Sequence, residues 1–197
     1  MNILEEIQIW RISENRTIKA KIVELTRDIA QTKIDGRWWD LTDVPRSKRK
    51  KENDNHWNWT RNVGLHRNQI LWECVAVLSA ENEIEGAMIV RFDVKSRIES
   101  DEGCVYVDLL STAPRNRDWL VDKPIYKGIG TELLYWAVRK SFELGFNGRV
   151  ALDADPKPKT LEFYQNRRFQ KVVPIYEELI GYELSAENAE IWVSERR

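Results

Sequence analysis

Residues 123–136 read KPIYKGIGTELLYW and place two glycines, Gly128 and Gly130, in a short turn beside Lys127. An amphipathic helical pattern begins directly after the turn, with its apolar face formed by Ile129, Leu133, Leu134, Ala137, Val138 and Phe142. The first backbone N–H groups of such a helix have no partner within it, and the positive end of the helix dipole points at the turn. The stretch therefore suits a phosphate or pyrophosphate group.

A plain strand-to-helix connection is an equally good interpretation of this turn when it is taken alone. It is not a P-loop, because no Gly-Lys-Ser/Thr sequence follows the glycines. It is not the complete dinucleotide fingerprint either, since Leu133 stands where the third glycine belongs. The order of the neighbouring elements must decide between the two interpretations.

Composition narrows the function classes. The 197 residues include 31 basic and 32 acidic side chains, so a net charge of -1 gives no overall attraction to nucleic acid or to an anionic membrane. Cys74 and Cys104 lie in apolar runs without metal-ligand spacing, which predicts buried thiols, no disulfide and no metal site. The start lacks a signal-peptide pattern and no stretch is apolar enough to span a membrane, so we expect a cytoplasmic protein without membrane contact.

Strand and helix patterns alternate along the chain and predict the α/β class. Residues 7–13 alternate apolar and polar side chains as a strand does, and the spacing of Ile18, Ile22, Leu25 and Ile29 predicts an amphipathic helix. Strands are predicted at residues 71–79, 83–92, 104–112, 148–154 and 179–184, and helices at 129–142, 157–169 and 185–196. Ser185 is the expected cap of the last helix. Residues 35–69 show no period and predict a long loop with short helical pieces.

This order resembles the GNAT superfamily of acetyl-CoA-dependent N-acetyltransferases. The resemblance rests on LLSTAPRNR at 109–117, YKGIGTELL at 126–134, RVALDA at 149–154 and TLEFYQNRRF at 160–169, and it covers about residues 70–184. It implies one domain over residues 1–197, with the loop 35–69 as an insertion. The implied fold is a mixed, mostly antiparallel twisted sheet of about six or seven strands, splayed between strands 4 and 5 and flanked by helices.

The resemblance also implies where acetyl-CoA binds. Its pyrophosphate meets the turn formed by Lys127, Gly128, Ile129, Gly130 and Thr131, and its pantetheine arm pairs with the strand at Leu110, Ser111 and Thr112. Two positions depart from the family pattern. Ile125 stands where the family has Arg or Gln, and Arg168 replaces a glycine before Phe169.

For catalysis, the resemblance implies that Tyr164 protonates the departing thiolate, with a core tyrosine as the alternative. Asp108, a carboxylate within an apolar strand, is the first candidate for the base, and Glu73 is the second. Each carboxylate has a structural alternative, as the partner of a neighbouring strand or as an edge group facing water. Residues 117–124 resemble an insertion that forms a flap near the active site, so we expect Asn116, Arg117 or Trp119 to touch substrate or cofactor.

The insertion 35–69 is the expected source of acceptor specificity. Trp38, Trp39, Trp57 and Trp59 are expected to fasten this loop to the domain as a lid, and Trp39 is a candidate substrate contact or part of a dimer seam. The basic run RSKRKK at 46–51 next to WNWT at 57–60 is a pattern that single-stranded nucleic acid favours. A solvated loop diluted by Glu52 and Asp54 is the preferred interpretation.

We therefore predict an N-acetyltransferase that moves an acetyl group from acetyl-CoA to a primary amine by direct attack in a ternary complex, without a metal. The acceptor is left open between a small molecule, a protein amine and an aminoacyl-tRNA. Whether the protein forms a homodimer is also left open. The alternative is a non-catalytic module that binds acyl-CoA or nucleic acid on the same fold.

Overall fold

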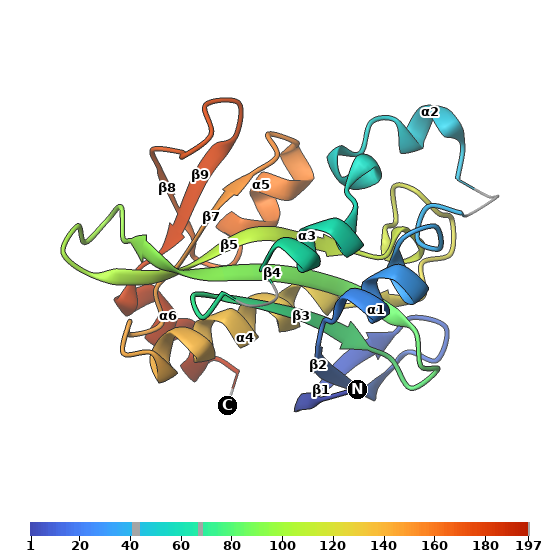
Figure 1. The fold of residues 1–197 in the computed structure, drawn as a ribbon, viewed down its shortest axis with the longest axis horizontal. Helices are drawn as coiled ribbons and strands as arrows, with labels where there is room; N and C mark the ends of the chain where they lie inside the picture. The colour runs from blue at the N-terminus through green and yellow to red at the C-terminus, as the bar shows by residue number, and fades with distance from the viewer. Residues whose placement is uncertain (41–43, 67–68, 197) are drawn as a thin grey trace. The chain divides into compact units, whose positions relative to one another are not determined.

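The computed structural model describes residues 1–40, 44–66 and 69–196. Packing divides the chain into two compact units, one built from residues 1–89 and 109–133 and the other from residues 90–108 and 134–197. Strands β4 and β5 and helix α4 contribute to both units (Figure 1). The prediction of a single domain stays a prediction.

The first unit holds strands in the order β6-β1-β2-β3-β4-β5. Their bounds are β1 Ile3–Arg11, β2 Arg16–Glu24, β3 Trp72–Leu78, β4 Ile84–Lys95, β5 Gly103–Thr112 and β6 Tyr126–Lys127. Strand β1 pairs in antiparallel fashion with β2 and β6, and β2 pairs in the same way with β3. The β3 and β4 strands form where the apolar runs predict them.

The predicted helix over residues 18–29 is wrong, because most of it is strand β2. Ile18, Ala20 and Ile22 alternate with exposed or half-exposed lysines, and Ala20 and Ile22 are buried. The steps of four in the sequence are multiples of the two-residue period of a strand, so the two patterns coincide there. Only Arg27–Ile29 (α1) and the π-helical turn Ala30–Ile34 (η1) are helical.

The described part of the insertion is a chain of short helices, as its sequence predicts; residues 41–43, 67 and 68 lie outside the description. The helices are α2 Arg46–Arg49, η2 Asn53–His56 and α3 Trp59–His66. The Asp35 carboxylate caps α3 by accepting from the backbone N–H groups of Trp59, at 3.0 Å, and Thr60, at 2.8 Å. Figure 1 shows α3 next to α1, beside strand β3.

Two tryptophans fasten the insertion to the first unit, as predicted. Trp38 and Trp59 are each 2% exposed and join a core cluster with residues of β2, β3 and β4. The indole N–H of Trp38 donates to the Ile84 carbonyl at 3.0 Å, and Trp57 packs edge-on against Trp59 at 5.8 Å between ring centroids. The insertion is therefore built on buried aromatic rings.

The second unit holds strands in the order β4-β5-β7-β9-β8, with the new bounds β7 Val150–Ala154, β8 Gln170–Val172 and β9 Ile180–Leu184. Strand β7 runs parallel to β5 and antiparallel to β9. The helices are α4 Ile129–Glu143, α5 Pro158–Gln165 and α6 Ala186–Ser194. Ser185 caps α6 as predicted, since its hydroxyl accepts from the backbone N–H of Asn188 at 3.3 Å. Within this unit α4 lies beside α6 (Figure 1), and the Tyr135 and Trp192 rings of the two helices meet edge-on, 6.0 Å apart between centroids.

The strands form the large, mostly antiparallel sheet flanked by helices that the sequence predicts. The described residues form nine strands instead of six or seven. Strand β2 was predicted as a helix, and β6 and β8, with two and three residues, are too short to be recognised from a pattern. Both cysteines are free, and burial raises the pKa of each thiol to about 12. Among the described residues, no helix is long and apolar enough to cross a membrane.

Candidate functional site

The glycine turn directly precedes helix α4 in the first unit. Strand β6 ends at Lys127, Gly128 has φ +90°, and α4 begins at Ile129. The Gly128 carbonyl accepts from the backbone N–H of Glu132 at 2.9 Å, which closes the first turn of the helix. A positive φ of this size is strained for residues with a side chain, so the turn needs a glycine at residue 128.

The space around the turn fits a phosphate group. A Cβ built on Gly128 meets no heavy atom within 4 Å, and Lys127 and Gly128 are both exposed. Ile129 and Gly130 are buried, and they fix the start of the 15-residue helix against the protein. Gly128, directly before the helix, is exposed and faces open space. The N-terminus of a long helix, a nearby lysine and an unobstructed approach are features that favour the binding of an anion.

Gly86 on β4 sets the position of α4. A Cβ on Gly86 would lie 2.5 Å from Ile129 Cγ2 and 3.1 Å from Leu133 Cδ1, closer than side chains pack. Helix α4 therefore lies directly against the strand backbone, at a distance that only glycine permits. Sequence reasoning missed this residue, although a glycine inside an apolar strand is a signal of close backbone approach.

Glu85, the neighbour of Gly86, holds the segment that leads into the turn. Its buried carboxylate accepts from Arg115 Nε at 3.0 Å and from Asn116 Nδ2 at 2.8 Å. The Asn116 Oδ1 accepts in turn from the backbone N–H of Tyr126 at 3.1 Å. Both ends of the Asn116 amide are thus used inside the protein, and its predicted contact with substrate stays a prediction.

Ile125, the departure from the family pattern, is held through its backbone. Its N–H donates to the Arg115 carbonyl at 3.2 Å, and its carbonyl accepts from the N–H of Ile12 at 3.0 Å. The apolar side chain is 37% exposed and brings no donor to a phosphate. Residue 125 therefore offers no side-chain donor to an anion at this turn, and the donors of the turn itself include its backbone N–H groups and Lys127.

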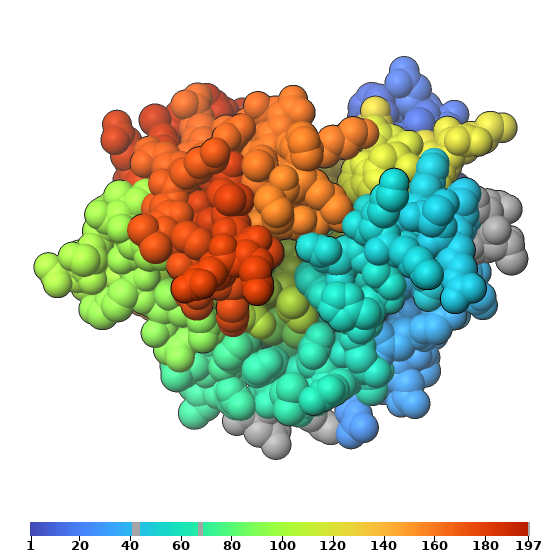
Figure 2. Space-filling view, turned by 90° about the horizontal axis from the view of Figure 1, so that it is seen from above, coloured from blue at the N-terminus to red at the C-terminus, as the bar shows by residue number. Residues whose placement is uncertain are grey.

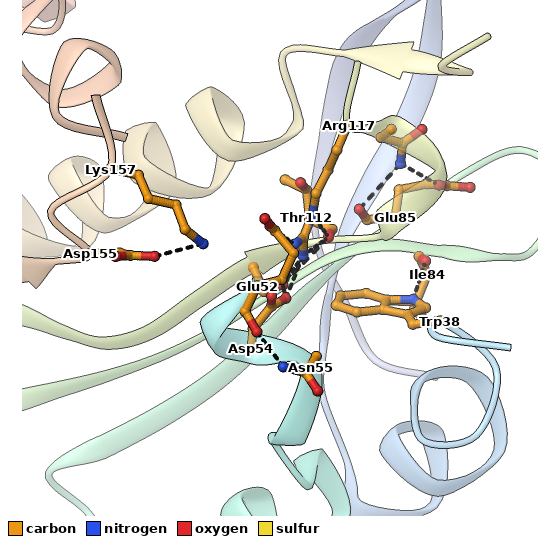
Figure 3. A network of polar contacts seen from close by, with 12 residues as sticks. Trp38, Glu52, Asp54, Asn55, Ile84, Glu85, Thr112, Arg117, Asp155 and Lys157 are labelled. Atoms are coloured by element: carbon orange, nitrogen blue, oxygen red, sulfur yellow. Dashed lines mark hydrogen bonds and ion pairs between the residues drawn. The ribbon is translucent and has the colours of Figure 1, made fainter. Parts of the chain in front are cut away.

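The end of β5, at Ser111 and Thr112, is bound to the guanidinium of Arg117. Nε and Nη2 of Arg117 donate to the Thr112 carbonyl at 3.0 and 2.6 Å, and Nη2 also donates to Ser111 Oγ at 2.8 Å (Figure 3). Leu110 is half-buried beside them. Strand β5 pairs with β7 from Val105 to Val107, and the predicted splay of the sheet beyond this pairing stays a prediction.

Arg117 also binds two carboxylates of the insertion. Its Nη1 donates to Glu52 Oε2 and to Asp54 Oδ1, each at 2.9 Å, and its Nη2 bonds Asp54 Oδ2, which also accepts from the Ser111 hydroxyl (Figure 3). All four side chains are buried. Burial by itself raises the pKa of Asp54, but hydrogen bonds and charge from Arg117, with a smaller contribution from Ser111, outweigh it and lower that pKa.

Trp39 lies against the same arginine. The Arg117 guanidinium carbon lies 5.2 Å from the Trp39 ring centroid and that of Arg49 lies 5.6 Å away, while Arg49 Nη1 donates to the Trp39 carbonyl at 2.7 Å. Cations over an indole face are attracted by its quadrupole. Trp39 is therefore part of the anchor of the insertion, and its contact with substrate stays a prediction, as does that of Trp119, which is 43% exposed.

Tyr164 occupies the middle of an aromatic cluster in the second unit. On α5 it is 7% exposed, stacks with Tyr182 at 5.7 Å between centroids, and meets Phe163 and Phe169 edge-on. Burial raises the pKa of its phenol, and the charge of Arg167 offsets part of that effect. The phenol is thus protonated at physiological pH, which the role of an acid requires.

The two candidate bases lie in different units. Asp108 is on β5 in the second unit, where it is half-buried, and its charge contributes to raising the pKa of Tyr106, an effect due first to burial of that phenol. Glu73 is on β3 in the first unit, also half-buried, next to Cys74. Both remain candidates. The described residues contain no group of three His, Cys, Asp or Glu side chains arranged as metal ligands.

A buried ionic cluster in the second unit escaped the sequence analysis. Arg97 Nη1 donates to Asp153 at 2.7 Å, its backbone N–H donates to Glu183 at 2.7 Å, and its Nη2 donates to the carbonyls of Leu152 and Tyr182. Asp153 also accepts from the backbone N–H groups of Ile175 and Tyr176. The segment 93–103 is a polar stretch in the sequence, and nothing local indicates that its half-buried arginine pairs with the buried carboxylates of Asp153 and Glu183.

Solved structures match this fold over most of its length. The GNAT domain of S. lividans PAT aligns with a TM-score of 0.61 at 13% identity, covering 91% of this chain and 96% of that one. The chain has the GNAT fold. A mutant of the AtaT toxin bound to the C-terminus of the antitoxin AtaR and to acetyl-CoA aligns with a TM-score of 0.57 at 16% identity, covering 89% and 98%. An acetyltransferase from Thermus thermophilus aligns with a TM-score of 0.54 at 15% identity, covering 93% of this chain and 99% of that one.

No family model matches the sequence, and no curated protein matches it. The GNAT resemblance of the motifs and the structural matches nevertheless agree on the fold. At 13–16% identity the matches show the fold alone.

The Arg117 cluster predicts a loss of stability in acid. Because the folded state lowers the pKa of Asp54, its stabilising effect is complete above the ordinary value of 3.8 and is lost as pH falls through the folded pKa. Asp54→Asn should destabilise the protein by roughly 3–5 kcal/mol near neutral pH, the cost of breaking a buried ion pair. It should also flatten the dependence of unfolding free energy on pH below about pH 5.

Urea unfolding between pH 3 and pH 7 measures both effects. Asp122→Asn is the matched control, because Asp122 is exposed and its charge should contribute little. Equal stability losses and equal pH profiles for the two variants would show that Asp54 does not anchor the insertion.

Proposed function

We propose that this protein is an N-acetyltransferase that transfers the acetyl group of acetyl-CoA to a primary amine. The observation that carries the proposal is the turn at Gly128, which opens a long helix onto free space beside Lys127. The GNAT fold supports it, and so does the acetyl-CoA in the structure of the AtaT mutant, a protein of the same fold. The acceptor is defined only as an amine.

Acetyl-CoA, when bound, supplies an activated thioester as the acetyl donor. The backbone N–H groups of residues 129–131, together with Lys127, bind its pyrophosphate. The end of β5, at Leu110, Ser111 and Thr112, lies alongside its pantetheine arm. Because Arg117 fixes Ser111 and the Thr112 carbonyl, that strand end is rigid before any ligand arrives.

Proton transfer requires one group that accepts and one that donates. An amine attacks only in its neutral form, so Asp108 or Glu73 accepts its proton, directly or through water. Tyr164 donates a proton to the leaving thiolate, a role that its buried, protonated phenol supports. No metal takes part in the proposed reaction.

Gly128→Glu should weaken acetyl-CoA binding by more than about tenfold, since it puts a negative side chain at the pyrophosphate and strains the turn. Calorimetric titration with acetyl-CoA measures the change. Gly145→Glu is the matched control, because Gly145 also has a positive φ, +78°, and an open Cβ position. Equal affinities in the two variants would place acetyl-CoA elsewhere on the protein.

Tyr164→Phe should lower thiol release by about a hundredfold or more while leaving the affinity for acetyl-CoA within about twofold, because a general acid acts only in the chemical step. The assay follows CoA thiol over a panel of amines. Tyr182→Phe is the control, a buried tyrosine that stacks on Tyr164. Equal losses of thiol release in the two variants would assign Tyr164 a packing role. If the wild type binds acetyl-CoA but releases no thiol with any amine, the non-catalytic module is favoured instead.

A further inference from the structure

Helix α2 and the two residues after it carry five positive charges in six residues, Arg46, Lys48, Arg49, Lys50 and Lys51. Arg49 turns inward and is engaged with Trp39. The other four side chains are exposed. We call these four, Arg46, Lys48, Lys50 and Lys51, the basic ridge.

The acidic residues that follow do not neutralise the basic ridge. In the sequence, Glu52 and Asp54 stand directly behind it and indicate a diluted, solvated loop. In the structure, Glu52 is 7% and Asp54 8% exposed, and both pair with Arg117. The expectation that these two charges dilute the run is therefore wrong, because the fold withdraws them from the surface.

The basic ridge is both unpaired and held in place. Among residues 1–40, 44–66 and 69–196, no ion pair involves any of its four side chains. The backbone of the ridge is held at two places. Arg49 donates a hydrogen bond to the Trp39 carbonyl, and Glu52 and Asp54, after the ridge, accept hydrogen bonds from Arg117. Figure 2 shows this segment, in cyan, on the outer surface of the molecule.

Clustered like charges without counter-charges repel one another, so a protein retains stability more easily when an anion neutralises them. The ordering cost of binding is small here because the backbone of the ridge is already fixed. With a net charge of -1, the protein as a whole does not attract polyanions, so binding of a polyanion needs a local cluster of positive charge such as this ridge.

We propose that the basic ridge binds the phosphate backbone of single-stranded nucleic acid. Three of its four cations are lysines, whose compact charges on flexible stems can each pair with a phosphate of a repeating backbone. The exposed His56 and the half-exposed Trp57 follow on the same anchored segment. Aromatic rings beside cations are the combination on which unpaired bases stack.

Fluorescence anisotropy of labelled oligouridylate and oligothymidylate tests this proposal across a salt series. Each phosphate contact with a single strand contributes about 0.7 to the slope of log affinity against log salt. The double variant Lys48→Gln/Lys51→Gln should weaken binding and reduce the slope by about 1.4. Lys19→Gln/Lys171→Gln removes the same charge from exposed lysines on β2 and β8 and should leave the slope unchanged.

Equal losses in the two double variants, or no binding by the wild type at low salt, would overturn the proposal. Binding of poly-glutamate that depends on Lys48 and Lys51, without binding of either oligonucleotide, would assign the ridge to an acidic protein instead. Acetyl-CoA titration of the Lys48→Gln/Lys51→Gln variant should match the wild type. The ridge and the proposed acetyltransferase activity can therefore fail separately.

Discussion

The buried guanidinium of Arg117 is the interaction on which the first unit depends. Arg117 is only 5% exposed to solvent. A positive charge that water cannot reach is stable only if carboxylates and carbonyls surround it. Glu52, Asp54, Ser111 and Thr112 supply these partners. The same bonds that satisfy the arginine therefore hold the insertion against the end of β5 and fix that strand end, where the pantetheine arm is proposed to lie.

A second constraint acts at Glu85 and Gly86, two neighbouring residues of β4. Gly86 admits helix α4 against the strand, while Glu85 holds Arg115 and Asn116 and, through Asn116, the residue before Lys127. The turn at Gly128 is thus positioned from both sides by one strand. In the proposed complex with acetyl-CoA, preorganisation of this kind would compensate for the missing Arg or Gln at residue 125, because the backbone donors would need no rearrangement to meet the pyrophosphate.

Much of the fold follows from local patterns, whereas the site depends on contacts that the sequence does not reveal. The apolar face of α4 and the branched runs of β3, β4 and β5 have the periods of their elements, so their positions are predictable. The prediction failed at strand β2, because the steps of four between its apolar residues fit both the helical period and the two-residue period of a strand. Arg117 meets Glu52 and Asp54 across 65 and 63 residues, and no local rule identifies such a pair. Because Glu52 and Asp54 are buried, they do not neutralise the basic run before them, although their place in the sequence suggests that they do.

The proposed acetyltransferase activity depends first on the binding of acetyl-CoA at the turn formed by Gly128. Amide hydrogen exchange of the full protein, with and without saturating acetyl-CoA, locates the ligand without knowledge of the acceptor amine. We expect slower exchange at residues 127–131 and 110–112 when acetyl-CoA is bound, because the ligand occupies those backbone groups. Unchanged exchange at both segments, with or without protection elsewhere, would contradict it.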